Sequence, residues 1–113
     1  MRSLIAVAAF TLMGSVAFAA SKGTQFWNLT ANTITSFQLA PAGTGAWGRN
    51  QCENDKDGSV DHDERLKITG ITTGTYDAKL TDNKGRTCIV KGLAIKENAI
   101  FSIDEKQLGG CQK

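Results

Sequence analysis

The sequence predicts an all-β domain, a small antiparallel β-sandwich or partly open barrel of about six strands that follows a cleaved signal peptide. Three observations lead to this prediction. Helical periodicity is nearly absent after the N-terminal segment, short runs alternate apolar with polar residues, and turn residues separate these runs at intervals of about 8–12 positions. No internal repeat or low-complexity linker divides the chain, so we expect a single domain over residues 20–113.

Residues 1–19 are predicted to be a secretory signal peptide. A basic start at Arg2 precedes a short apolar run up to Ala20, and the run ends in a small-x-small cleavage site, so we expect the cut after Ala19. The run is shorter than the about 20 residues that span a bilayer. The mature domain, residues 20–113, is therefore expected in the periplasm or outside the cell, without a membrane anchor.

The first half of the domain is predicted to hold one hairpin followed by a long loop. Two β-rich runs, 26–29 and 34–39, are separated by Ala31 and Asn32, which indicates a hairpin. Pro41 ends the second run, and the glycine-rich stretch after it is predicted to be loop.

The second half is predicted to hold the remaining strands. Apolar and polar residues alternate over 65–69 and 76–81. The Asn and Gly of TDNKGR indicate a tight turn before the next run, 88–95, and a further turn precedes the last run, 101–103. The tail after these strands has room for one short helical turn before its two glycines.

The composition argues against two kinds of partner and against an enzyme. The thirteen Lys and Arg residues include Arg2 of the signal peptide, so the mature domain carries a net charge of about +1 against eleven Asp and Glu. Such a balance provides no field that gathers nucleic acid or anionic lipid. No serine elbow, phosphate loop or paired glycosidase carboxylates stand out, and His62 has no marked partner to orient it. We expect a non-enzymatic binding or structural protein with a protein or small-molecule partner.

Three cysteines predict one disulfide bond. An exported domain meets an oxidising compartment, where a bridge across a loop of this size contributes about 2–4 kcal/mol to stability. Cys88 lies in a predicted strand and Cys111 in a terminal segment that would otherwise fray, so we predict this pair. A bond between Cys52 and Cys111 is the alternative, and the third cysteine stays free or binds something else.

The stretch ENDKDGSVDHDE, residues 53–64, is the main candidate for a site, and we call it the acidic loop. It holds six of the eleven acidic residues of the chain. With Gly58 at position 6 of a calcium-binding loop, oxygen-bearing side chains fall at the ligating positions, and the loop resembles that of an EF-hand. The predicted ligands are Glu53, Asp55, Asp57, Ser59, Asp61 and Glu64.

Two features of the acidic loop depart from the EF-hand pattern. Glu53 stands where the motif has aspartate, which is expected to weaken binding, and neither flank is helical. We therefore predict an EF-like calcium loop on a β scaffold, whose oxygens would also accept manganese or a lanthanide. The alternative is a hydrated hairpin loop that turns at Asp57-Gly58.

Trp27 and Trp47 are the second candidate site. In a small sandwich such residues usually belong to the core. If the two were exposed together, they would form a platform for a ligand or a partner.

Several motifs resemble a group of small exported proteobacterial β-domain proteins without an assigned activity. They are an Asn-x-Thr opening at 28–30, Ala-Pro-Ala-Gly at 40–43, Trp47-Gly48, and Gly-x-Tyr-Asp at 74–77. The resemblance implies an exported β domain and no particular function. The loop after Trp47-Gly48 is longer and more acidic than in that group, which makes it the part that differs.

Overall fold

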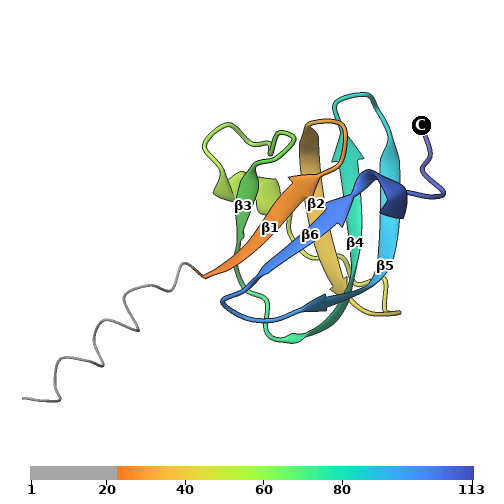
Figure 1. Ribbon diagram of the computed structural model, residues 1–113. Helices are drawn as coiled ribbons and strands as arrows, with labels where there is room; N and C mark the ends of the chain where they lie inside the picture. Colours follow the sequence, from red (N-terminus) through yellow and green to blue (C-terminus); the bar gives the residue numbers. More distant parts are fainter. Residues whose placement is uncertain (1–22) are drawn as a thin grey trace, which may run out of the picture.

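Six strands and two short 3-10 helices form two three-stranded sheets in a computed structural model that describes residues 23–113 (Figure 1). The strands are β1 (Thr24–Leu29), β2 (Ile34–Pro41), β3 (Arg65–Ile68), β4 (Gly74–Asp82), β5 (Thr87–Ile95) and β6 (Ile100–Asp104). The helices are η1 (Gln51–Asn54) and η2 (Glu105–Gln107). The predicted signal peptide and its cleavage site lie outside the described residues.

The two sheets have the strand orders β3-β1-β6 and β2-β4-β5. The predicted all-β fold of about six strands is confirmed. Every pair is antiparallel except β1 with β6, which run parallel. A parallel pair needs a long connection, and here nearly the whole domain lies between the first and the last strand. The alternation of apolar and polar residues within each strand gives no information about which strands pair.

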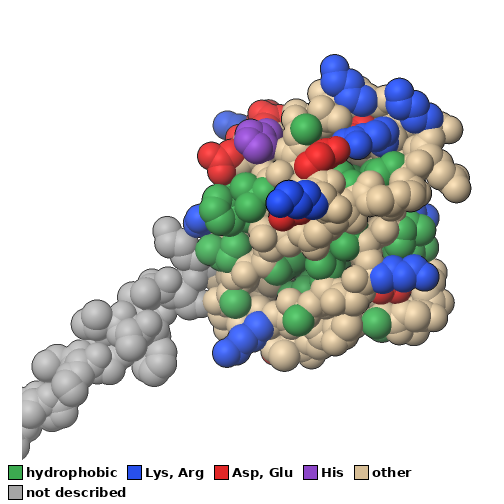
Figure 2. Space-filling model, turned by 45° about the vertical axis from the view of Figure 1, so that its right-hand side comes forward, with side chains coloured by type: hydrophobic (Ala, Val, Ile, Leu, Met, Phe, Trp, Pro, Cys, Tyr) green, Lys and Arg blue, Asp and Glu red, His purple; other side chains and the backbone are tan. Residues whose placement is uncertain are grey.

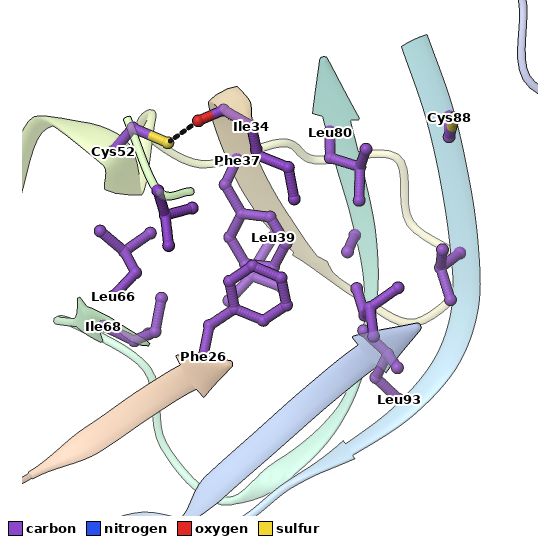
Figure 3. Close-up of a cluster of buried hydrophobic side chains, with 14 of the residues drawn as sticks. Phe26, Ile34, Phe37, Leu39, Cys52, Leu66, Ile68, Leu80, Cys88 and Leu93 are labelled. Atoms are coloured by element: carbon purple, nitrogen blue, oxygen red, sulfur yellow. Dashed lines mark hydrogen bonds between the residues drawn. The ribbon is translucent and has the colours of Figure 1, made fainter. Parts of the chain in front are cut away.

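The core lies between the two sheets and is centred on aromatic side chains. Phe26 of β1 and Phe37 of β2 stack with ring centroids 4.1 Å apart, and Figure 3 shows them pointing toward each other from opposite sheets. Phe101 of β6 packs 5.4 Å from Phe26. Full burial of one such side chain contributes about 1.5–3 kcal/mol, so this cluster joins the sheets.

The predicted disulfide between Cys88 and Cys111 is confirmed. It fixes the C-terminal tail to the first part of β5, where Gln112 and Thr87 exchange two backbone hydrogen bonds of 2.7 and 2.9 Å. Cys52 is free and buried, so the alternative pairing is not formed. No helix within residues 23–113 is long and apolar enough to cross a membrane.

Candidate functional site

The acidic loop connects η1 to β3 and turns at Gly58, whose φ of +72° favours glycine. Its carboxylates engage separate neighbours. Glu53 pairs with Arg49 at 3.4 Å, and Asp55 Oδ2 accepts the N–H of Asp57 at 2.9 Å. The first half of the loop therefore uses its charges locally.

The second half of the acidic loop behaves in the same way. Asp61 Oδ1 accepts a hydrogen bond from the Thr33 hydroxyl, and Glu64 Oε1 accepts one from the N–H of Asp61, both at 2.9 Å. Ser59, two residues before Asp61, is half-buried. Among residues 23–113, no three Asp, Glu, His or Cys side chains come together where they could hold a metal ion. The predicted ligands share one loop but do not converge, and calcium binding stays a prediction.

The segment 48–54, which leads into the acidic loop, covers the edge of β2 with uncharged residues. Asn50 Oδ1 accepts the N–H of Phe37 at 2.9 Å and that of Cys52 at 3.0 Å. Gly48 donates its N–H to the carbonyl of Leu39 at 2.9 Å. The outer side of β2 thus finds its hydrogen bonds in the loop that follows the strand.

The same segment covers the edge of β3. The Gln51 side chain exchanges two 3.0 Å hydrogen bonds with the backbone of Thr69, and Asn54 donates to the carbonyl of Lys67 at 2.7 Å. Because η1 bonds to β3 on one side and to β2 on the other, it closes the seam between the two sheets there (Figure 1). Covered edges resist pairing with another chain.

The Asn-x-Thr motif fastens the end of the acidic loop. Asn28 is fully buried, and its amide group donates to the carbonyls of Asn32 and Val60, each at 3.0 Å. Its Oδ1 accepts from the N–H and the hydroxyl of Thr30 at 2.9 and 2.7 Å. This motif therefore has a structural role in the fold.

Asp77 joins two other motifs of the resemblance. It is buried and accepts the N–H of Gly43 at 3.0 Å and that of Gly92 at 3.1 Å. These two hydrogen bonds lower the pKa of its carboxyl group below the ordinary value. Gly92, with φ of +74°, lies next to the irregularity in the pairing of β4 with β5. The motif residues hold loops in place.

Trp27 and Trp47 do not form one platform. Trp27 lies on the outer face of β1, where Arg65 covers its ring at 4.9 Å and its Nε1 donates to Asp63 at 3.0 Å. Trp47 belongs to the loop after β2, and Lys79 of the neighbouring strand β4 lies 5.1 Å from its ring centroid. Each indole packs against its own sheet with a cation over its face.

Cys52 and His62 hold positions with structural partners. Burial, and then the negative charge of Asp55, raises the pKa of the Cys52 thiol to about 11. Its sulfur lies 3.7 Å from the carbonyl of Ile34 (Figure 3), and a buried, protonated thiol is a poor nucleophile. His62 Nδ1 lies 2.7 Å from the carbonyl of Thr30.

The edges of β5 and β6 contrast with those of β2 and β3. Each ends its sheet, and the two strands do not pair with each other. Thr87 directs its backbone groups to Gln112, so by alternation the N–H and C=O of Ile89 also point away from β4. Within residues 23–113, no hydrogen bond reaches those groups of Ile89. We call this side of β5, from Ile89 to Lys91, the open edge.

The two most exposed large apolar side chains of the described residues lie on these same strands. Ile89 of β5 is 43% exposed and Ile100 of β6 is 47% exposed. Figure 2 shows hydrophobic side chains in the middle of the face that the two strands border. Sequence analysis missed this feature, although Ile89 interrupts the alternation by standing between Cys88 and Val90.

No cavity or cleft was found in the part of the chain that the structure describes. Comparisons with protein-family models, with curated proteins and with solved structures gave no match.

Proposed function

We propose that this is an exported, non-enzymatic binding protein that holds an extended segment of a partner protein at the open edge of β5. One observation carries the proposal. The chain covers the edges of β2 and β3 with its own amide side chains, whereas among residues 23–113 no hydrogen bond reaches the outward backbone groups of Ile89 on β5, and the Ile89 side chain is exposed beside them. Proteins usually cover strand edges because bare edges pair with other chains.

The binding mode follows from the chemistry of a strand edge. The free N–H and C=O of Ile89 supply backbone hydrogen bonds to an added strand, and these provide affinity without requiring a pocket. The side chain of Ile89 supplies apolar contact beside them. The Cys88–Cys111 bond and the bridge between Gln112 and Thr87 hold the tail at the start of β5, and no backbone group of the tail bonds to Ile89.

Site-directed photo-crosslinking in cells that export the protein tests this proposal. A photoreactive residue at Lys91 is expected to give one discrete adduct, whereas the same residue at Lys67, on the covered edge of β3, is expected to give none. Ile89→Pro removes the apolar side chain and a backbone N–H that points away from β4, so it should abolish the Lys91 adduct while the protein stays folded. Equal adducts at both positions, or none at Lys91, would contradict the proposal.

Calcium binding by the acidic loop is a second candidate, and the conformation of Gly58 favours it. The left-handed φ of +72° is what position 6 of such a loop requires. Terbium luminescence on the mature chain tests it, with binding expected at about 10⁻⁴–10⁻³ M. Glu64→Gln is the sharp variant, because an amide oxygen can still accept the N–H of Asp61 but carries no charge. A response that Glu64→Gln leaves unchanged, or no saturation up to millimolar metal, would exclude this role.

A further inference from the structure

The surface charges on the strands of the sheet that contains the open edge are cations. Strands β2, β4 and β5 contain four charged residues, namely Asp77, Lys79, Asp82 and Lys91. Asp77 and Asp82 are buried and their carboxylates accept hydrogen bonds from neighbouring groups. Lys79 and Lys91 are therefore the surface charges that these strands present.

The position of these lysines relative to Ile89 defines a pattern. Lys79 is the cross-strand partner of Ile89 on β4, and Lys91 lies two residues further along β5 on the same, exposed face. Ile89 thus has one positive charge beside it on the neighbouring strand and another further along its own strand.

We infer that the segment bound at the open edge is an acidic strand, in which a carboxylate lies two positions from an apolar residue. This inference rests on the proposed function and specifies the chemistry of its partner. On an added strand, alternate side chains lie on the face of Ile89, so the residue opposite Ile89 is apolar and the residue two positions along, opposite Lys91, is a carboxylate. A segment with an acid on both sides of the apolar residue meets Lys91 whether the added strand is parallel or antiparallel.

Three synthetic peptides with the mature chain test the inference. The first has the order Thr-Glu-Val-Val-Val-Glu-Thr, and the others carry Gln or Lys in place of both Glu residues. We expect the Glu peptide to bind most tightly and the Lys peptide most weakly, with the preference lost at high salt. Lys91→Gln should weaken the Glu peptide about fivefold and leave the Gln peptide unchanged. Lys67→Gln, the same change beside the covered edge of β3, should alter neither.

The outcomes separate this inference from the proposed function. Equal binding of all three peptides that Ile89→Pro abolishes would overturn the acidic preference and leave the open edge as a binding site. Binding that Ile89→Pro leaves intact would overturn both. If Ile89→Pro does not fold, the double variant Lys79→Gln with Lys91→Gln provides the test, because it changes no backbone group. Failure of every peptide to bind, or a dimer of the mature chain that buries the open edge, would also overturn the inference.

Discussion

Protonation of Asp82 is expected to destabilise the protein in acid by an amount that the structure predicts. Asp82 ends β4 and is 3% exposed. Its carboxylate accepts the N–H groups of Lys84 and Arg86 at 3.0 Å, the Arg86 Nε at 2.8 Å and the Asn32 amide at 3.1 Å. Arg86 continues to Glu105 at 2.9 Å, so one carboxylate holds the β4–β5 turn and, through arginine, the segment after β6.

The magnitude follows from the pKa of Asp82. Burial by itself raises this pKa, but the hydrogen bonds from Asn32, Arg86 and Lys84 outweigh it and lower the pKa from 3.8 to about 2. One pKa unit corresponds to about 1.4 kcal/mol, so the charged carboxylate contributes about 2 kcal/mol. Because the folded-state pKa is the lower one, this contribution is complete above the ordinary pKa of 3.8 and is lost as the pH falls toward 2.

Urea unfolding of the native protein and of Asp82→Asn at several pH values measures this contribution. The native protein should be more stable at pH 6, and the difference in free energy of unfolding should narrow by about 2 kcal/mol between pH 5 and pH 2. Asp57→Asn, at an exposed position of the acidic loop, is the matched control and should follow the native curve. Equal pH dependence of the native protein and Asp82→Asn over this range would refute the reasoning.

Three further predictions concern the buried Asn28, the disulfide bond and the free thiol of Cys52. Asn28→Ala should lower the free energy of unfolding by about 2 kcal/mol in urea, because it leaves the buried N–H of Thr30 without its acceptor and removes a donor from the carbonyls of Asn32 and Val60; a cost below about 0.5 kcal/mol would contradict this role. Reduction of Cys88–Cys111 should cost about 2–4 kcal/mol and increase amide exchange at Thr87, and unchanged exchange there would show that the tail stays bound without the bond. Cys52 should react with a thiol reagent only on unfolding, so stoichiometric labelling of the native protein would contradict its burial.

The sequence predicted the strands themselves, which depend on local pattern, but the hairpin predicted from runs 26–29 and 34–39 is wrong, because β1 and β2 lie in different sheets. Alternation identified the strands because each strand has one buried face, and Cys88 with Cys111 followed from the need to fix a fraying tail. The parallel pairing of β1 with β6 could not be predicted, because it joins the two ends of the domain. The bare edge of Ile89 could not be predicted either, because it depends on which strands end the sheets.

The spacing of the acidic loop matches the ligand pattern of a calcium loop along the chain, but spacing does not determine where side chains point. The loop is held by uncharged residues at and just before its start, namely the amides of Asn50, Gln51 and Asn54. Those amides carry no metal-binding signature, and their partners in β2 and β3 are distant in the sequence. For this reason only the structure shows that these residues close the seam between the two sheets.

The charge distribution raises the question of whether the acidic loop of one copy is the acidic strand that the open edge of another copy binds. The backbone of the loop argues against this. The N–H groups of Asp57, Gly58, Asp61 and Glu64 are all bonded within the loop, and that of Val60 is bonded to Ile34. A segment whose donors are already used cannot pair as an added strand without unfolding. We therefore expect the mature chain to sediment as a monomer at 0.1 M salt, and a dimer that dissociates at high salt would show that the loop does serve as a partner.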